Sequence, residues 1–183
     1  MMRRWCVGVA AALLLLTLVY MAAEREVVVR TGTVVRLRSA PVDPRDLFRG
    51  DFVRLSYQAS TLPRGLWRDG LLTAIPKRDQ RVYAVLRQGP DGLADVEAVT
   101  DIRPHEGLYL RGRVGNAWSE SVRVRYGLEA YFMQQGRALE LERERNREGI
   151  QVPLDMEVAV AGSGLAVIRG HQWGPLGLGL NLE

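Results

Sequence analysis

The hydrophobic pattern divides the chain near residue 24. Trp5–Ala23 is a run of 19 residues without a charge, and as a helix it would span about 28 Å, close to the hydrocarbon thickness of a bilayer. Arg3 and Arg4 precede the run, and Glu24 follows it. By the positive-inside rule, the pattern predicts a cytoplasmic N-terminus at residues 1–4, a transmembrane helix, and an exported remainder that begins at Glu24.

A cleaved signal peptide is the alternative interpretation of the same run. Cleavage favours small residues one and three positions before the cut. A cut after Ala23 would place Met21 three positions back, and a cut after Ala22 would place Tyr20 there. Both are unfavourable, and the only cysteine, Cys6, lies near the front of the run rather than after it, as a lipoprotein signal would require. We therefore favour an uncleaved, single-pass membrane anchor.

Beyond the anchor, residues 24–170 carry the pattern of a β-rich domain. Gly32 interrupts the first β-branched segment and indicates a bulge or a break there. Turn signals separate the remaining segments, so the predicted fold is mostly β, an antiparallel sandwich or partly open barrel with one N-terminal transmembrane helix and one or two short helices. Period-two alternation or β-branched enrichment predicts about eight strands, at Glu26–Arg38, Asp51–Gln58, Arg81–Gln88, Leu93–Thr100, Leu108–Val114, Ser121–Tyr126, Val152–Ala161 and Leu165–Arg169.

Four further segments lack the strand pattern. Pro63–Pro76 contains apolar residues without a clean period, and we expect a long loop or flap that exposes apolar area. Arg137–Glu148 has Glu–Arg pairs at i,i+3 and predicts a helix, whereas Leu128–Phe132 predicts a short helical segment or a bend. Residues 171–183 are an apolar Gly/Leu tail, and we expect its Leu176–Leu182 to be exposed as well.

The segment 40–57 is predicted to form a rigid corner. Pro41 and Pro44 remove two backbone donors, so no regular ladder runs through them. Asp43 is placed to cap a short helix that begins at Pro44, and Asp46 falls in its first turn near the positive end of the dipole. Gly50 can close the turn in a left-handed conformation, and the alternating strand follows directly.

This corner resembles the signature of the bacterial GDYXXLXY family, in the string Gly50-Asp51-Phe52-Val53-Arg54-Leu55-Ser56-Tyr57. Phe52 stands where the family name has tyrosine, so no chemistry can depend on a hydroxyl at that position. The resemblance implies an architecture, a location and a polytopic membrane-protein partner, and no activity. It covers roughly residues 26–170. The residues that carry it are Pro41, Asp43, Pro44, Asp46, Gly50, Asp51, Phe52, Leu55 and Tyr57 in the first motif, and Tyr126, Gly127, Glu129, Tyr131 and Phe132 in the second.

Charge argues against a nucleic-acid partner. The formal net charge of +4 falls to +2 once Arg3 and Arg4 are assigned to the anchor. Lys77 is the only lysine, and the arginines alternate with apolar residues along predicted strands instead of forming a basic run with interleaved aromatics. A modest attraction to anionic lipid headgroups beside the anchor remains compatible with this pattern.

Candidate chemistry is sparse. His105 and His171 lack metal-ligand spacing, and no metal, cofactor or small-molecule ligand is predicted. Calcium at the corner's three aspartates is conceivable, but capping and ion pairing explain them better. The sharpest enzyme hypothesis pairs Ser39 with Lys77 as a dyad resembling that of type I signal peptidases. Against it, the methionine of that family's motif is missing after Ser39, and Lys77 lies in a Pro-flanked loop.

Together these patterns predict a bacterial inner-membrane protein with a periplasmic β-rich domain. The expected function is a non-catalytic accessory or interaction domain that works with a polytopic membrane protein. The alternative is a membrane-anchored hydrolase or peptidase that uses Ser39 and Lys77. Single-pass anchoring in the membrane is common to both.

Overall fold

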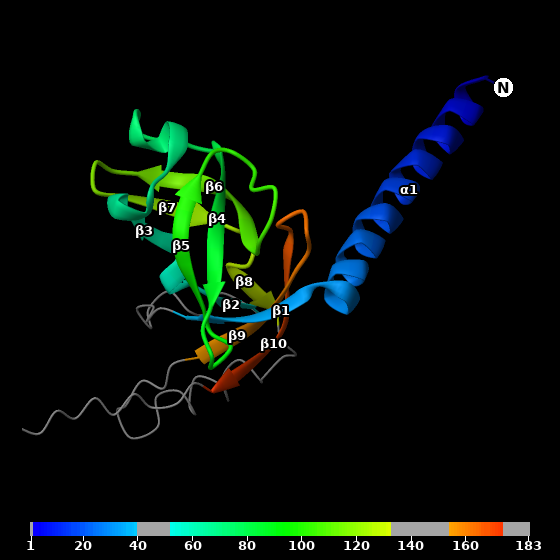
Figure 1. The fold of residues 1–183 in the computed structure, drawn as a ribbon. Coiled ribbons are helices and arrows are strands. Elements are labelled where there is room, and N and C mark those ends of the chain that lie inside the picture. The colour runs from blue at the N-terminus through cyan, green and yellow to red at the C-terminus, as the bar shows by residue number, and fades with distance from the viewer. Residues whose placement is uncertain (1, 40–51, 133–153, 174–183) are drawn as a thin grey trace, which may run out of the picture.

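The computed structural model describes residues 2–39, 52–132 and 154–173 (Figure 1). One long helix, α1 (Met2–Thr31), projects from a β domain. The domain contains three short 3-10 helices and ten strands within the described residues. The prediction of a mostly β fold with one N-terminal apolar helix is therefore confirmed.

Helix α1 continues past the apolar run into residues predicted as a strand. Arg30 forms an ion pair with Glu26 at 2.7 Å, and the Thr31 hydroxyl donates to the Val27 carbonyl at 2.9 Å. The strand prediction for 26–31 was wrong because valine disfavours a helix by only about 0.7 kcal/mol per residue, while extending an existing helix avoids the cost of nucleation. Gly32 then marks a true break between the helix and the first strand.

The strands form three antiparallel sheets. The three-stranded sheet has the order β1-β9-β10, the two-stranded sheet pairs β2 with β8, and the five-stranded sheet has the order β3-β7-β6-β4-β5. The strand bounds are β1 (Thr33–Arg38), β2 (Phe52–Arg54), β3 (Thr61–Pro63), β4 (Arg81–Gln88), β5 (Ala94–Thr100), β6 (Tyr109–Ala117), β7 (Ser121–Arg125), β8 (Ala130–Phe132), β9 (Leu154–Val160) and β10 (Ala166–Trp173).

The core lies between the three-stranded and five-stranded sheets. The two sheets also meet edge to edge, because Arg36 of β1 bridges Leu93 and its N–H donates to the Gly92 carbonyl at 3.1 Å. This contact gives the domain the partly closed form expected from its sequence. Fully buried side chains come from both sheets, including Val35, Leu37, Met156 and Val158 on one side and Val82, Val99, Leu110, Val114, Val122 and Val124 on the other.

The expected flap at Pro63–Pro76 contributes two large apolar side chains to the core, although most of its residues are exposed. Trp67 and Leu71 are 0% and 1% exposed. They are delivered by the 3-10 helices η3 (Arg64–Leu66) and η4 (Asp69–Leu72), which follow η2 (Gln58–Ser60) and β3. The prediction of exposed apolar area was wrong for Trp67 and Leu71, because side chains presented by successive short turns can be buried without any periodicity. Leu72 and Ile75 alone remain exposed among the large apolar side chains of this segment.

Two further boundaries differ from expectation. Leu128–Phe132, predicted as a short helical segment or a bend, contains a bend at Glu129 followed by strand β8, whose residues pair with β2. Strand β10 extends to Trp173, beyond the predicted end of the domain at residue 170, because its pairing with β9 continues in a shifted register after a bulge between Ile168 and Gly170. The predicted helix at Arg137–Glu148 and the tail Leu176–Leu182 lie outside the described residues.

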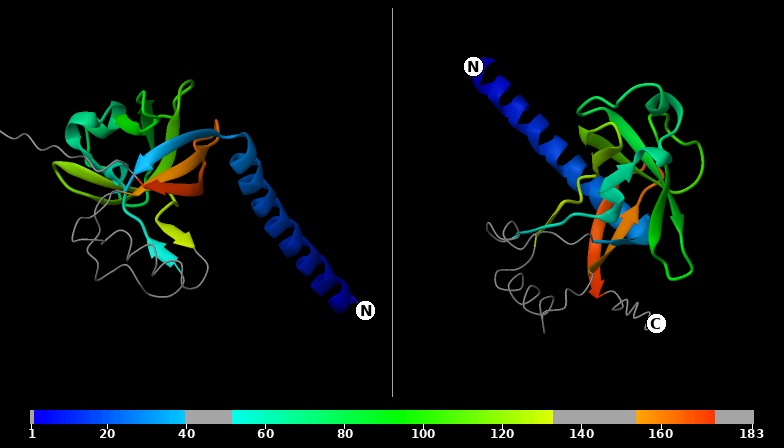
Figure 2. Two further views of the ribbon diagram at one scale, coloured as in Figure 1. Left: turned by 90° about the horizontal axis from the view of Figure 1, so that it is seen from below. Right: turned by 90° about the vertical axis from the view of Figure 1, so that its left-hand side faces the viewer.

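Helix α1 and the β domain are joined at a close contact. Val28 of α1 is buried, and a Cβ at Gly32 would lie 2.6 Å from the Val28 carbonyl oxygen and 3.0 Å from the backbone nitrogen of Val160. The end of α1 packs against β9 and β10, beside the turn that joins them (Figure 2). The direction of the helix is thus coupled to the position of the three-stranded sheet.

Candidate functional site

The two motifs meet in the structure through a reciprocal pair of tyrosine hydrogen bonds. The Tyr57 hydroxyl donates to the Leu128 carbonyl at 2.8 Å, and the Tyr126 hydroxyl donates to the Ala59 carbonyl at 2.7 Å. Burial raises the pKa of both phenols, and the negative charge of Glu129 raises it further. Both hydroxyls therefore stay protonated and act as structural donors. We call this pair of contacts the tyrosine clasp.

Glu129 completes the connection between the motifs. Its carboxylate accepts the N–H groups of Tyr126 at 2.6 Å and Gly127 at 2.9 Å, and its carbonyl accepts the N–H of Leu55 at 2.8 Å. Gly127 has φ +82, a left-handed conformation that favours glycine. Leu55 is itself buried in the core. The motif residues that make these contacts therefore stabilise the folded domain.

The remaining motif residues are placed only in part. Phe52 pairs with Phe132, and Val53 pairs with Tyr131, in the β2–β8 ladder. This ladder extends the contact between the two motifs into a short sheet. The corner residues Pro41, Asp43, Pro44, Asp46, Gly50 and Asp51 lie outside the described residues.

The structure does not form the Ser39–Lys77 dyad. Ser39 bridges Tyr57 in an antiparallel contact and is only 4% exposed, and its Oγ has no hydrogen-bond partner among the described residues. Lys77 is exposed, and its backbone exchanges hydrogen bonds with Gln80. The serine thus lacks the basic partner that nucleophilic activation requires.

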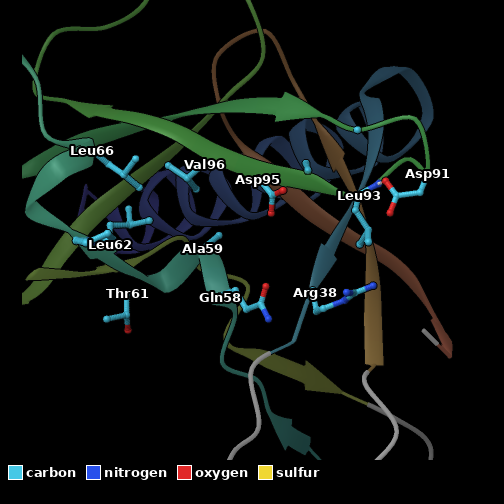
Figure 3. A pocket seen from close by; sticks show the side chains of 13 residues that line it. Arg38, Gln58, Ala59, Thr61, Leu62, Leu66, Asp91, Leu93, Asp95 and Val96 are labelled. Atoms are coloured by element: carbon cyan, nitrogen blue, oxygen red, sulfur yellow. Dashed lines mark hydrogen bonds between the residues drawn. The ribbon is translucent and has the colours of Figure 1, made fainter. Parts of the chain in front are cut away.

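A first hollow lies at the end of β1, directly before the first motif. It has a volume of about 450 Å³. Figure 3 shows the charged Arg38, Asp91 and Asp95 toward one side of it and the apolar Leu62, Leu66 and Val96 toward the other. Its one guanidinium and two carboxylates give the lining a net negative charge, which disfavours an anionic ligand.

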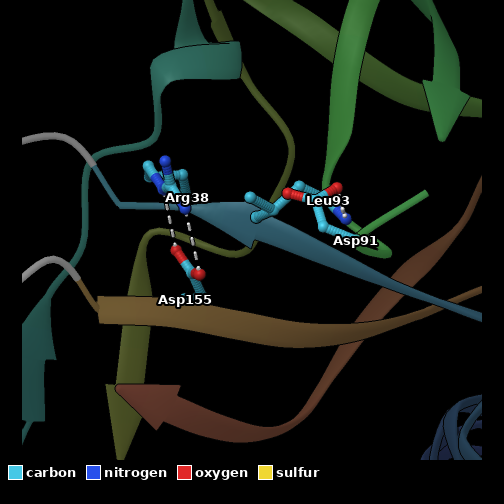
Figure 4. A network of polar contacts seen from close by, with 4 residues as sticks. All are labelled: Arg38, Asp91, Leu93 and Asp155. Atoms are coloured by element: carbon cyan, nitrogen blue, oxygen red, sulfur yellow. Dashed lines mark hydrogen bonds and ion pairs between the residues drawn. The ribbon is translucent and has the colours of Figure 1, made fainter. Parts of the chain in front are cut away.

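Arg38 is held in place by a buried acid. Its Nε and Nη2 donate to the two carboxylate oxygens of Asp155 at 3.2 and 3.5 Å (Figure 4). Asp155 is 1% exposed and lies opposite Arg38 in the β1–β9 register. The hydrogen bond to Asp155 raises the pKa of Arg38, and the charges of Asp91 and Asp95 raise it further. Asp91 accepts the N–H of Leu93, so Arg38 and Asp91 of this hollow are both engaged in holding the fold.

A second hollow, of about 490 Å³, is lined by four arginines on three adjacent strands. Arg81 of β4 lies opposite Arg113 of β6, and Arg113 lies opposite Arg125 of β7. Arg111 is two residues from Arg113 and therefore on the same face of β6. We call Arg81, Arg111, Arg113 and Arg125 the arginine cluster. All four are exposed.

Few acidic groups balance the arginine cluster. Arg125 forms an exposed ion pair with Asp79 at 2.5 Å, and Arg113 donates to the Asp79 backbone carbonyl at 2.9 Å. Glu129 also lines the hollow, but its oxygens accept backbone N–H groups. Within the described part of the chain, no hydrogen bond or ion pair engages the guanidinium group of Arg81 or Arg111, although the backbone N–H of Arg111 donates to the Gly164 carbonyl at 2.8 Å. Like charges directly opposite each other destabilise a sheet, so this arrangement costs the domain stability.

Sequence reasoning did not find the arginine cluster. The signal was present as alternating arginines in the strands Leu108–Val114 and Ser121–Tyr126, but alternation indicates only a solvent-facing side. The strand register, which aligns three arginines in a row, cannot be read from the sequence.

Among the described residues, no three His, Cys, Asp or Glu side chains lie close enough to hold a metal ion. Helix α1 is long and apolar enough to cross a membrane, and its apolar stretch is not buried against the domain. Fold and site together define a mostly β domain that follows a candidate membrane-spanning helix.

Comparison with known families agrees with this class. The family model described as GDYXXLXY protein matches residues 14–170, which is most of the chain, and the chain therefore belongs to the GDYXXLXY family. No curated protein and no solved structure matches it.

Proposed function

We propose that this protein is a membrane-anchored, non-catalytic accessory domain that works with a polytopic membrane protein. The observation that carries this proposal is the exposed apolar surface of α1. Leu13, Leu14, Leu15 and Leu16 are each about 60% exposed, and nothing in the described domain covers them. Such a surface is stable in lipid or against other transmembrane helices.

The proposed topology has a single pass in the bacterial inner membrane. Arg3 and Arg4 precede the apolar run, and the positive-inside rule favours keeping them in the cytoplasm. The β domain is then periplasmic. The direct continuation of α1 into the domain through Gly32 supports this topology, because it leaves no long linker between the membrane and the domain.

The hydrolase alternative is less well supported. It requires Ser39 and Lys77 to be in contact, and Ser39 Oγ has no hydrogen-bond partner among the described residues. The family motif residues are also committed to the fold by the tyrosine clasp and by Glu129. A non-catalytic role therefore fits these residues better than catalysis does.

Site-specific photocrosslinking in the native membrane tests the partner. A photoreactive residue at Leu15 in α1, or at the exposed Ile75 in the domain, is expected to give adducts with one and the same polytopic membrane protein. The polar, exposed Asn116 is the control position and should give none. Recovery of the chain alone from both positions, with no stoichiometric adduct, would contradict the accessory function.

A further inference from the structure

We propose that the arginine cluster binds the phosphate of an anionic phospholipid headgroup in the membrane that holds α1. This inference rests on the proposed membrane anchoring. The four guanidinium groups come from three neighbouring strands and surround one hollow. It assigns a ligand to residues that neither motif includes.

The charge of the site selects an anion. The arginine cluster contributes four positive charges, against one each from Glu129 and Asp79. The Asp79–Arg125 pair is more than half exposed on both sides, and such exposed pairs contribute little. Arg81 and Arg111 have no carboxylate partner in the described structure, so their donors are available to a ligand.

The shape of the site suits a phosphate. A guanidinium presents donors in a planar fork that matches two oxygens of one phosphate, and guanidinium is more weakly hydrated than ammonium. The hollow's volume of about 490 Å³ lies within the range of sites that enclose small ligands or headgroups. Leu165, which contributes an apolar wall, offers a surface for the glycerol end of the headgroup.

The position of the site places it beside the anchor. Leu165 belongs to the turn between β9 and β10, and the end of α1 contacts both of these strands (Figure 2). Gly32, which follows α1, lies against the backbone of Val160 in β9. In Figure 1, β4 begins at the upper end of the domain, and α1 also runs upward from its junction with β1. The site thus lies on the side of the domain from which the anchor departs.

The length of α1 sets the distance to the lipid. Glu24–Thr31 continues the helix for eight residues beyond the apolar run, which places the domain about 12 Å from the hydrocarbon core. The headgroup region occupies about 5–7 Å of that distance on each side of a bilayer. Tethering therefore keeps the arginine cluster within about one Debye length of anionic headgroups.

A lipid explains these observations better than an acidic protein segment. An acidic peptide segment would need basic groups spaced along an extended path on the sheet. The four arginines instead surround one compact hollow, whose lining contains no other basic residue. The anchor supplies lipid at a high effective concentration without any second protein.

The test measures lipid selectivity of the purified full-length chain. The detergent-solubilised protein is titrated with phosphatidylglycerol or zwitterionic phosphatidylcholine, and retained lipids are counted by native mass spectrometry. We expect one phosphatidylglycerol to be retained in preference to phosphatidylcholine. Replacing the two unpaired arginines, in Arg81→Gln/Arg111→Gln, should weaken phosphatidylglycerol binding about 30-fold.

Matched variants separate a built site from general charge. Arg87→Gln/Arg169→Gln removes the same charge from exposed positions outside the cluster and should leave binding within twofold of wild type. Arg81→Lys/Arg111→Lys keeps the charge but loses the planar forks. Its affinity for phosphatidylglycerol should lie between that of the Arg81→Gln/Arg111→Gln variant and that of the control variant. The glutamine variant is expected to melt no lower than wild type, because it removes opposed like charges, and this verifies folding.

Each other outcome overturns the proposal. Equal retention of both lipids, or an equal loss in the control variant, would leave no specific lipid site. Competition by inorganic phosphate at the same concentration as phosphatidylglycerol would indicate a soluble anion instead, and tighter binding of an acidic peptide would indicate a protein partner. The assay contains no second protein, so its result is independent of whether photocrosslinking finds a polytopic partner.

Discussion

At the scale of single residues, the tyrosine clasp explains why the two motifs occur together. Each hydroxyl reaches a backbone carbonyl that no strand ladder satisfies, and each crosses about seventy residues of sequence to do so. A buried carbonyl without a partner is costly, so the clasp fixes the path of both segments.

Removing one hydroxyl of the clasp should destabilise the domain. Tyr57→Phe leaves the buried Leu128 carbonyl unpaired and is expected to lower the free energy of unfolding by about 1–3 kcal/mol. Tyr83→Phe is the control, because Tyr83 is buried but its hydroxyl has no hydrogen-bond partner among the described residues. Equal denaturant midpoints for the two variants would show that the clasp does not contribute to stability.

The same tyrosines predict instability at high pH. Their pKa values are raised in the folded state, so above about pH 10 the unfolded chain loses protons that the folded chain keeps. Stability is then fully present below pH 10 and falls as the pH rises, by about 1.4 kcal/mol per pH unit for each tyrosine. Unfolding of Tyr57→Phe should show about half of this tyrosine-dependent slope, and an unchanged slope would contradict the assignment.

At the scale of elements, the segment between β3 and β4 closes the core without regular structure. The N–H of Arg68 donates to the Val99 carbonyl at 2.8 Å, and Trp67 bridges Val99 of β5. The indole of Trp67 donates to the Leu62 carbonyl at 3.5 Å. The segment between β3 and β4 therefore packs against β5, an edge strand of the five-stranded sheet.

Truncating Trp67 should be far more costly than truncating an exposed tryptophan. Trp67→Ala leaves a large cavity in the core and is expected to cost about 3–5 kcal/mol. Trp118, which is 50% exposed in the β6–β7 turn, is the matched control, and Trp118→Ala should change stability by about 0.5 kcal/mol or less. Similar losses in thermal melts of the two variants would place Trp67 outside the core.

The junction between α1 and β1 should tolerate no side chain at Gly32. A Cβ there would approach backbone atoms of Val28 and Val160, and Gly32→Ala is expected to cost about 1–3 kcal/mol. Gly65 has nothing within 4 Å of its ideal Cβ, so Gly65→Ala serves as the control. If Gly32→Ala and Gly65→Ala have the same melting temperature, the end of α1 can move away from β9, which would contradict the prediction.

The elements that the sequence predicts well are those with their own local signals. The β4–β5 hairpin has two strand-like segments joined by the turn Gly89-Pro90-Asp91-Gly92, and the structure confirms the hairpin, with one irregularity between Val85 and Leu86. The helical 26–31 was missed because valines fit either state, and Trp67 was placed on a flap because its burial depends on distant β5. The arginine cluster depends entirely on strand register, which no single segment encodes.

At the scale of the whole molecule, α1 is connected to the β domain without a linker segment. The apolar helix is exposed, the domain has its own core, and a single residue, Gly32, separates the last helical residue from β1. In the proposed topology, a domain held this close to α1 presents one face to the membrane. The arginine cluster is the strongest candidate for that face.

Topology is the central claim, and accessibility of an engineered thiol tests it most directly. In a Cys6→Ser background, which removes the only native cysteine, Ser119→Cys places a thiol at an exposed position of the β domain. A membrane-impermeant maleimide should label it in intact spheroplasts, whereas Met2→Cys should be labelled only after lysis. Labelling of Met2→Cys in intact spheroplasts, with Ser119→Cys protected until lysis, would contradict an exported domain.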